Sequence, residues 1–157
     1  MHFSIPGHDP FDIETLILDL NGTISIDGKL IRGVKKRIEE LRTLLRVVLF
    51  TGDTQGTGRQ IADVLGIEIR LTKNASEKAK EAESLNPETT ATIGNGAIDL
   101  ELFRTVKLPI CVIEAEGAYT ETLRASIVVH RSIIAALDFL LKHNRAIATM
   151  RNSTTLR

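Results

Sequence analysis

The stretch LILDLNGT, residues 16–23, decides the fold of this chain. It opens with an apolar run that is typical of a strand buried on both faces, and Asp19 closes that strand with a carboxylate. Gly22 and Thr23 follow, where a chain can turn sharply and present backbone N–H groups. In open α/β sheets, ligands bind at the carboxyl ends of the strands. The stretch therefore predicts a first strand over 15–20 with a functional acid at its end.

Hydrophobic periodicity extends this pattern along the chain. Residues 23–31 alternate around Asp27 and Gly28, which is a strong signal for a β-hairpin. Further strands are predicted over 46–50, 67–71, 89–93, 108–113 and 126–129, and helices over 34–45, 58–65, 77–85, 97–103, 119–124 and 132–143. In the first of these helices, Leu44 is expected on the buried stripe.

The order of these elements predicts the architecture. Strands that alternate with helices indicate a three-layer α/β/α sandwich with a mainly parallel, Rossmann-like sheet, and the hairpin is a small flap after strand one. Residues 1–12 are expected to be a tail or a short covering segment. The chain from Asn144 is expected to be a polar tail, frayed past Asn152. No repeat or linker divides the chain, so 1–157 is predicted to be a single domain.

Composition narrows the function classes. The 20 basic and 20 acidic side chains balance, and Trp is absent, so neither nucleic acid nor a membrane surface is an expected partner. Cys111 is the single cysteine and lies in an apolar run, which excludes an intramolecular disulfide and favours simple burial. No apolar run approaches the roughly 18 residues of a membrane span, and residues 1–10 lack the apolar core of a signal peptide. We expect a cytoplasmic protein.

Polar residues gather where the predicted strands end. Asp19, Thr51 and Asn95 close or follow three strands, and Asp99 comes a few residues later. Because the carboxyl ends of parallel strands share one edge, these groups can converge, and the lysine-bearing helix 77–85 starts near the same edge. Phosphoryl transfer requires this set: a nucleophile, donors for the phosphoryl oxygens, a positive charge and oxygen ligands for Mg²⁺.

Three of these segments resemble motifs of the haloacid dehalogenase superfamily. The stretch at Asp19 resembles its first motif, Asp-x-Asp-Gly-Thr, with Asn21 in place of the second Asp, and it also resembles the Asp-Lys-Thr-Gly-Thr motif of P-type ATPases. Residues 49–53 (LFTGD) resemble the second motif, and 94–99 (GNGAID) resemble the fourth, Gly-Asp-Gly-x-x-Asp. The resemblance spans about 12–141 and is closest to soluble, P-type-ATPase-like phosphatases.

The resemblance implies a Mg²⁺-dependent phosphatase that hydrolyses phosphoric esters or acyl phosphates. Asp19 matches the nucleophile that forms an aspartyl-phosphate. Thr51 and Gly52 match the hydroxyl motif that binds the phosphoryl group, and Lys78 matches the lysine that steadies both. Two neighbouring lysines remain alternatives because the spacing of this motif is loose: Lys73 and Lys80.

The resemblance also implies a metal site with two departures from the family pattern. Its ligands are Asp19, the backbone carbonyl of Asn21, Asn95 and Asp99. Asn21 replaces the acid that protonates the leaving group and activates water, a role worth about 10²–10⁴ in rate. We therefore expect slow turnover that favours acyl and aryl phosphates. Asn95 replaces a carboxylate with a neutral amide, so weakened metal affinity follows.

The chain has no interval long enough for a cap domain, and this predicts how accessible the site is. A cap domain would follow the hairpin or separate strands three and four, and neither interval is long enough for one. The site is therefore expected to be open to a small or macromolecular phosphorylated substrate, or covered by a second subunit. We expect a homo-oligomer in which the hairpin, 25–30, borders a neighbour's site.

Other interpretations remain open at this stage. If Asn21 and Asn95 have disabled turnover, the chain is a non-catalytic phosphate-binding or phosphoacceptor regulatory module. Gly-Asn-Gly at 94–96 is a partial dinucleotide fingerprint, with Glu114 about 20 residues on. The remaining alternatives are structural: the segment 51–54 as a loop with a helix cap, Asp53 as that cap, Asn95 as a turn residue with positive φ, Asp99 as a helix-dipole partner, and His130 as a surface residue.

Overall fold

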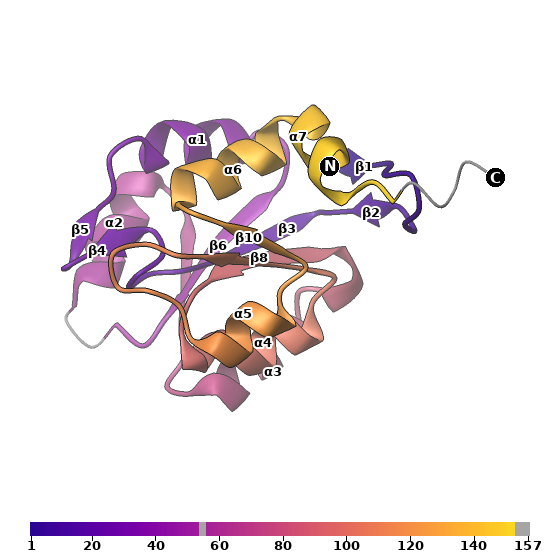
Figure 1. Cartoon of the computed structure of the whole chain (residues 1–157). Coiled ribbons are helices and arrows are strands. Elements are labelled where there is room, and N and C mark those ends of the chain that lie inside the picture. The colour runs from indigo at the N-terminus through magenta and orange to yellow at the C-terminus, as the bar shows by residue number, and fades with distance from the viewer. Residues whose placement is uncertain (54–55, 153–157) are drawn as a thin grey trace.

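The computed structural model describes residues 1–53 and 56–152 (Figure 1). Its centre is a six-stranded sheet in the order β10-β9-β8-β3-β6-β7, and every neighbouring pair is parallel. The strands are β3 (Thr15–Asp19), β6 (Arg46–Thr51), β7 (Glu68–Leu71), β8 (Thr90–Gly94), β9 (Leu108–Val112) and β10 (Val128–His130). The predicted parallel, Rossmann-like sheet is confirmed.

Helices cover both faces of this sheet, as Figure 1 shows. One face carries α1 (Val34–Leu41), α2 (Thr57–Leu65) and α6 (Ile133–Leu141). The opposite face carries α3 (Ala75–Glu83), α4 (Leu100–Thr105) and α5 (Thr120–Ala125). Two short 3₁₀ turns, η1 (Pro87–Thr89) and η2 (Ala97–Asp99), flank β8. The three-layer arrangement is therefore confirmed, with predicted boundaries shifted by one or two residues at several ends.

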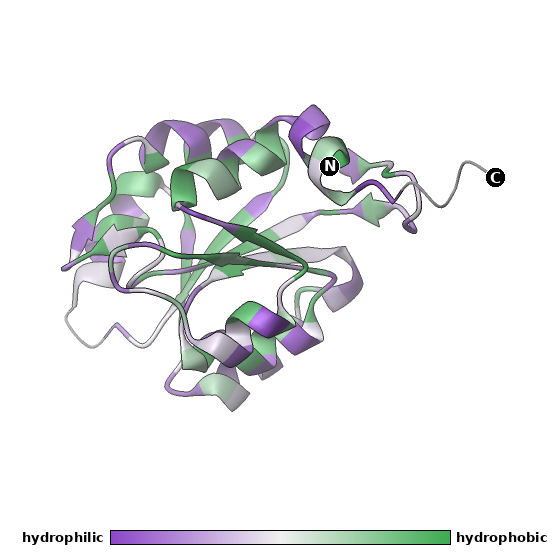
Figure 2. Cartoon of the chain, in the orientation of Figure 1, coloured by the Kyte–Doolittle hydropathy of each residue, from purple (hydrophilic) through white to green (hydrophobic). Residues whose placement is uncertain are grey.

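The two faces of the central strands feed separate hydrophobic clusters. On β3, Leu16 and Leu18 join the cluster beneath α1, α2 and α6. Ile17 points the other way and packs with Ala82 of α3 and Leu102 of α4. Figure 2 shows the resulting concentration of hydrophobic residues in the strands. Burial on both faces explains why the strands read as continuous apolar runs rather than alternating ones.

The hairpin that follows β3 forms as predicted. Strands β4 (Ser25–Ile26) and β5 (Lys29–Leu30) pair antiparallel. The two turn residues, Asp27 and Gly28, have φ angles of 50° and 73°. Positive φ at both central positions is the signature of a type I′ turn, whose twist matches that of the flanking strands.

The first helix is shorter than its periodicity predicts. It ends at Leu41, and Leu44, which we expected on the buried stripe, is 55% exposed. The hydroxyl of Thr43 donates to the carbonyl of Glu40 at 2.7 Å. A side chain that bonds its own backbone in this way competes with helical hydrogen bonds. The prediction of a helix over 34–45 was therefore wrong in its last turn.

The polar tail predicted from Asn144 is also wrong, because this segment forms α7 (His143–Met150). The helix buries Ala146 and Met150, one turn apart. It packs beside a two-stranded ribbon, β1 (His2–Phe3) and β2 (Phe11–Asp12), which confirms the covering segment at the N-terminus. Figure 1 places both at the amino ends of the central strands, opposite the hairpin. The fraying predicted past 152 lies outside the described residues.

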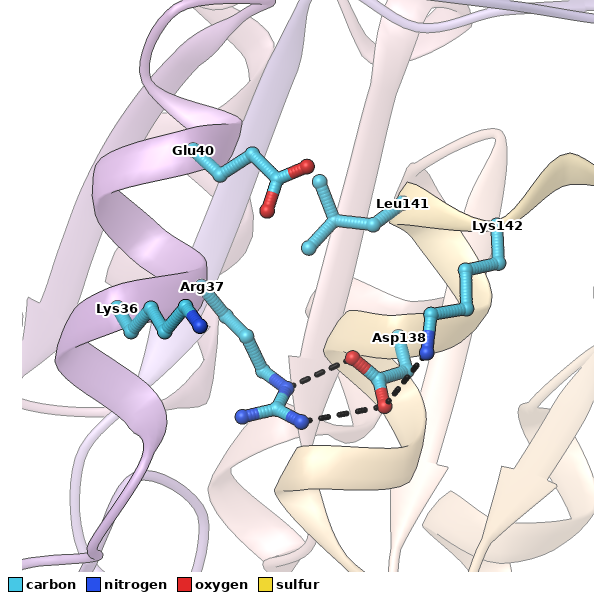
Figure 3. A pocket seen from close by; sticks show the side chains of 6 residues that line it. All are labelled: Lys36, Arg37, Glu40, Asp138, Leu141 and Lys142. Atoms are coloured by element: carbon cyan, nitrogen blue, oxygen red, sulfur yellow. Dashed lines mark hydrogen bonds and ion pairs between the residues drawn. The ribbon is translucent and has the colours of Figure 1, made fainter.

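An ion-pair group joins α1 to α6 (Figure 3). Arg37 donates from Nε and Nη2 to the two carboxylate oxygens of Asp138, at 2.7 and 3.2 Å. Lys142 and Arg145 approach the same carboxylate at 3.6 and 3.5 Å. We call these four residues the helix cluster. Because every charge in it finds a protein partner, its role is to hold the two helices together.

Candidate functional site

Three neighbouring strands of the sheet end at one cavity. Asp19 is the last residue of β3, Thr51 is the last residue of β6, and Asn95 follows β8 directly. All three line a cavity of about 350 Å³. The full lining is Asp19, Asn21, Thr51, Gly52, Asp53, Lys73, Lys78, Asn95, Gly96, Ile98 and Glu116. The structure thus brings together the residues that the strand ends predicted.

A buried lysine forms the floor of this cavity. Lys78 of α3 is 1% exposed, and its Nζ lies 2.6 Å from Asp19 Oδ1 and 2.6 Å from Asp99 Oδ1. We call these three residues the pocket cluster. Of the two alternative lysines, Lys73 lies exposed at the cavity wall, and Lys80 lines a separate groove between α3 and α4. The geometry therefore singles out Lys78 as the cation beside Asp19.

The electrostatics of the pocket cluster are unbalanced. Burial raises the pKa of Asp19 to about 6, helped by the nearby charge of Asp99, although Lys78 acts in the opposite direction. Burial alone would lower the pKa of Lys78, but its two carboxylate partners outweigh that effect and raise it. Two carboxylates thus share one ammonium group, which leaves one net negative charge in a buried place.

Asp99 stands behind the cavity rather than in its wall. Its side chain is 1% exposed, and its Oδ1 accepts from Lys78. Its Oδ2 accepts the backbone N–H groups of Asn95 and Gly96, each at 3.0 Å. Because protein donors occupy both oxygens, Asp99 orients Lys78 and the loop that carries Asn95. Of the predicted metal ligands, it is the one that the structure does not place in the lining.

Thr23 links Asp19 to Asn95. Its hydroxyl oxygen lies 3.3 Å from Asp19 Oδ2 and 3.1 Å from Asn95 Oδ1. A hydroxyl carries one hydrogen, so it donates to one of these oxygens at a time. Because the side chain of Thr23 is fully buried, its hydroxyl group holds these two oxygens close to one another. The motif resemblance included this threonine, but the sequence assigned it no role.

A glycine makes this close approach possible. Gly22 has φ of +73°, and a Cβ added there would lie 2.4 Å from Asn95 Nδ2, closer than side chains tolerate. Next to it, Asn21 is exposed and lines the cavity. The absence of a side chain at Gly22 therefore lets the side chain of Asn95 pack directly against the turn Leu20–Thr23.

The structure supports some of the purely structural interpretations of the site residues and not others. Asn95 is not among the non-glycine residues with positive φ in the described chain, which are Asp27, Asp53 and Asn86. Asp53 behaves as a cap, because its Oδ1 accepts from the N–H of Gly58 at 2.6 Å. The predicted loop over 51–54 ends at Thr54, which lies outside the described residues.

Two other titratable groups stand apart from the cavity lining. Cys111 is fully buried, and burial raises the pKa of its thiol to about 11, which confirms packing rather than reactivity. His130 is half-buried against the ring of Phe139, with ring centroids 5.0 Å apart. His130 is thus a partly covered residue, since α6 packs against one side of its ring, and it is not in the cavity lining.

The oxygens at this site fit a divalent cation of the Mg²⁺ type. Such ions take oxygen ligands, commonly from one or two carboxylates, and keep several waters. Asp19 Oδ2 and Asn95 Oδ1 already converge on Thr23, and Asn21 lies beside them. Within residues 1–53 and 56–152, no cluster of three His, Cys, Asp or Glu side chains has metal-binding geometry. A cation here would rest on a mixed set of carboxylate, amide and carbonyl oxygens.

Comparison with solved structures gives the fold. The cobalt-bound deoxy-D-mannose-octulosonate 8-phosphate phosphatase of Haemophilus influenzae aligns with a TM-score of 0.71 at 17% identity, covering 92% of this chain and 96% of that one. A Streptomyces avermitilis protein described as a hydrolase of the haloacid dehalogenase (HAD) family aligns at 0.66 and 24% identity, covering 96% and 92%. The chain has the haloacid dehalogenase-like fold.

A further HAD-like neighbour is described with ligands. It is a 3-deoxy-D-manno-octulosonate 8-phosphate phosphatase of Moraxella catarrhalis, in complex with a magnesium ion, a phosphate ion and KDO. It aligns with a TM-score of 0.69 at 18% identity, covering 89% of this chain and 94% of that chain. At this identity the likeness concerns the fold.

Sequence comparison adds closer relatives of this HAD-like chain. An uncharacterized protein of Methanocaldococcus jannaschii is 42% identical over 74 residues, which are 46% of this chain and 80% of the relative. A second uncharacterized protein of the same organism is 44% identical over 39 residues, which are 25% of this chain and 89% of the relative. The chain belongs to one family with these archaeal proteins. No family model matches it. Across the described residues, none of the helices is long and apolar enough to cross a membrane.

Proposed function

We propose that this chain is a Mg²⁺-dependent phosphatase of the HAD type, acting on phosphoric esters or acyl phosphates through an aspartyl-phosphate on Asp19. One observation carries the proposal: the carboxylate of Asp19 lies at the cavity floor with a buried ammonium group, Lys78 Nζ, 2.6 Å away. Phosphatases that share the fold add support, since two of them are 8-phosphate phosphatases.

The first step transfers the phosphoryl group to the protein. A carboxylate oxygen of Asp19 attacks phosphorus, and the bond from phosphorus to the leaving oxygen breaks with its electron pair on that oxygen. Lys78 donates to Oδ1 of Asp19 and adds positive charge beside the phosphoryl group. The second step is attack by water on the same phosphorus, which releases phosphate and restores the carboxylate.

Thr51 is suited to binding the transferred group. Its hydroxyl oxygen accepts the N–H of Asp53 at 3.1 Å. Among the described residues, its own hydrogen has no acceptor, so it remains available for a phosphoryl oxygen. Gly52 lies beside it in the exposed loop and offers a backbone N–H to the same group. Such preorganised donors stabilise the charge that develops during transfer.

The proposed cation site consists of Asp19, the carbonyl of Asn21 and the amide oxygen of Asn95, with Asp99 behind them. Mg²⁺ bound there neutralises phosphoryl charge and helps to orient the substrate. Because the pocket cluster carries net negative charge, it favours a cation even without substrate.

We further propose that turnover is slow. Asn21 lies in the cavity wall where the family motif has an acid, and an amide neither protonates a leaving oxygen nor activates water. The same observation favours a second candidate, a phosphoacceptor or phosphate-binding module that retains its phosphoryl group. The likeness to soluble P-type-ATPase-like phosphatases, which motivates both ideas, stays a prediction.

The proposed enzyme is a single domain without a cap, and its partner is a phosphorylated substrate. Between β5 and α1 the chain has only residues 31–33, and α3 alone fills the interval between β7 and η1. We also propose a homo-oligomer in which the β4–β5 hairpin borders the site of a neighbour. Gel filtration that shows a monomer at all concentrations would contradict this arrangement.

The test of the proposed function is phosphate release from acetyl phosphate and from an aryl phosphate, with and without Mg²⁺, beside the Asp19→Asn variant. Release that needs both Mg²⁺ and Asp19 is the expected result. If folded protein releases no more phosphate than the variant, hydrolysis is excluded. Intact-protein mass spectrometry after acetyl phosphate treatment then decides for the phosphoacceptor module, which predicts a phosphoryl group on wild-type protein and none on Asp19→Asn.

A further inference from the structure

One carboxylate in the cavity wall has no assigned role. Glu116 lies in the loop between β9 and α5, in a turn where the N–H of Gly117 donates to the carbonyl of Glu114 at 2.9 Å. Gly117 has φ of +77°, which lets the chain reverse at that point. The turn folds back over the carboxyl edge of the sheet and so brings Glu116 into the wall of the same cavity as Asp19.

This turn is fastened to the proposed metal site. Asn95 Nδ2 donates to the carbonyl of Gly117 at 3.0 Å, and the N–H of Tyr119 donates to the carbonyl of Asn95 at 2.8 Å. On its other side, Glu114 Oε1 accepts the N–H of Ile133 at the start of α6. The backbone that carries Glu116 is therefore held in place by Asn95 itself.

The side chain of Glu116 reaches the same point as that of Asn95. A Cβ built on Gly22 would lie 3.0 Å from Glu116 Oε2 and 2.4 Å from Asn95 Nδ2. The carboxylate thus lies across the tip of the Leu20–Thr23 turn, next to the amide. Among the described residues, it makes no hydrogen bond and no ion pair, so its charge is available to a ligand in the cavity.

Charge balance indicates what that ligand is. The pocket cluster contributes one net negative charge, and both Asn21 and Asn95 are neutral where the family motifs have acids. The affinity of hard divalent cations depends on the number of charged ligands. Glu116 restores a second negative charge at the cavity, which matches the double positive charge of Mg²⁺.

We propose that Glu116 supplies the second carboxylate of the divalent-cation site and so compensates for the neutral Asn95. This inference rests on the proposed function, because it concerns the cation of that same site. It assigns a residue from outside the recognised motifs to metal binding. In this arrangement, Asn95 keeps a structural task, since its amide hydrogen fixes the turn that delivers the charge.

The test measures Mg²⁺ binding to resting protein by isothermal titration calorimetry, without any phosphorylated substrate. Glu116→Gln is expected to weaken Mg²⁺ affinity by about tenfold or more. The variant should fold, because the side chain is exposed and, among the described residues, its carboxylate makes no hydrogen bond or ion pair that the substitution would break. Glu83→Gln is the matched control: this exposed glutamate of α3 lies in the separate groove beside α4, and its removal should leave the affinity unchanged.

A second variant tests the compensation directly. Adding Asn95→Asp to Glu116→Gln returns a carboxylate to the site, and it should recover most of the lost affinity. Equal affinity in wild type and Glu116→Gln would overturn the assignment of Glu116 while leaving the proposed phosphatase intact. Failure of wild-type protein to bind Mg²⁺ at all would overturn the metal site of the proposed function, and the assignment of Glu116 with it.

Discussion

The helix cluster and the pocket cluster are both built around a buried or half-buried acid, but their charges are balanced in opposite ways. In the helix cluster, one carboxylate, Asp138, meets three cations. Hydrogen bonds from Arg37 lower its pKa, and Lys142 and Arg145 act in the same direction. In the pocket cluster, Asp19 shares Lys78 with a second acid, Asp99, and the pKa of Asp19 is raised to about 6.

This difference separates a structural ion pair from a site. An acid that is surrounded by protein cations has nothing left to offer a ligand. A buried acid with too few neighbouring cations is stabilised by a cation that binds from solution. Acids whose pKa values are shifted in this way are common at functional sites. Substitutions at the helix cluster and at the cavity should therefore differ in their effects on catalysis and on stability.

The largest expected difference is in catalysis. Asp19→Asn removes the proposed nucleophile and should lower phosphate release from acetyl phosphate by at least about 10⁴-fold. Asp138→Asn removes an equally central acid from the helix cluster and should leave the rate unchanged. Rates of both variants, measured with excess Mg²⁺, check this. Substantial release by Asp19→Asn would contradict the proposed nucleophile.

The next difference is in stability. Lys78→Met leaves two buried carboxylates without a cation, and breaking a buried pair from one side costs about 3–5 kcal/mol. Arg37→Met leaves Asp138 with Lys142 and Arg145, so its cost should be about 1 kcal/mol or less. Urea denaturation of metal-free protein near pH 7 gives both values. Equal losses would mean that burial of the pocket cluster has little energetic effect.

A smaller effect is expected from adding an acid to the pocket. Asn21→Asp supplies the group that can protonate a leaving oxygen, so hydrolysis of an alkyl phosphate should rise by about 10²-fold. Acetyl phosphate, whose leaving group needs no proton, should respond much less. The ratio of the two rates, before and after the substitution, is the measurement. A folded variant with an unchanged ratio would show that the missing acid does not limit turnover.

The smallest effect is a pH dependence of stability. Because the pKa of Asp19 is about 6 in the folded chain and 3.8 as its reference, the folded state holds a proton that the unfolded state has released between these values. The contribution of Asp19 to the free energy of unfolding therefore falls as pH rises from about 4 to about 6, by an amount of order 2 kcal/mol. Asp138, with its lowered pKa, contributes in the opposite direction, since its stabilisation is lost as pH falls.

Denaturation of metal-free wild type and Asp19→Asn at several pH values isolates the contribution of the pocket cluster, because the carboxylates outside that cluster titrate alike in both proteins. The stability of wild type relative to the variant should decline across the window. A relative stability that is flat, or that rises with pH, would contradict the raised pKa.

The sequence predicts the central architecture well, for physical reasons. Strands such as Thr15–Asp19 are buried on both faces, and their apolar runs identify them without further context. Asp27 and Gly28 fix the hairpin because few residues adopt positive φ at two successive positions. Asn74 lies just before α3, where a side-chain acceptor is favoured, and its Oδ1 accepts the backbone N–H of Glu77 at 2.9 Å.

The elements that the sequence missed depend on distant contacts. Helix α7 buries only two side chains, Ala146 and Met150, and part of the surface it packs against is β1, at the other end of the chain. Its periodicity is too weak to distinguish it from a polar tail. Glu116 was missed for a related reason: nothing next to it in sequence shows that its turn folds back onto Asn95. The glycine at 117 was the available signal.

The ribbon and helix at the amino ends of the strands affect the order in which the chain can assemble. The ring of Phe3 packs at a tilt against His143, with ring centroids 4.6 Å apart. A ring nitrogen of His8 hydrogen-bonds the carbonyl of Met150 at 2.7 Å, across 142 positions of sequence. Contacts of such long range form late in folding, because the entropy of closing a long loop is lost before the contacts can stabilise the chain. During synthesis on the ribosome, β1 pairs with β2 from the same end of the chain, but both emerge long before α7 exists. Until α7 has left the exit tunnel, Phe3 and His8 lack the partners that they contact in the folded chain.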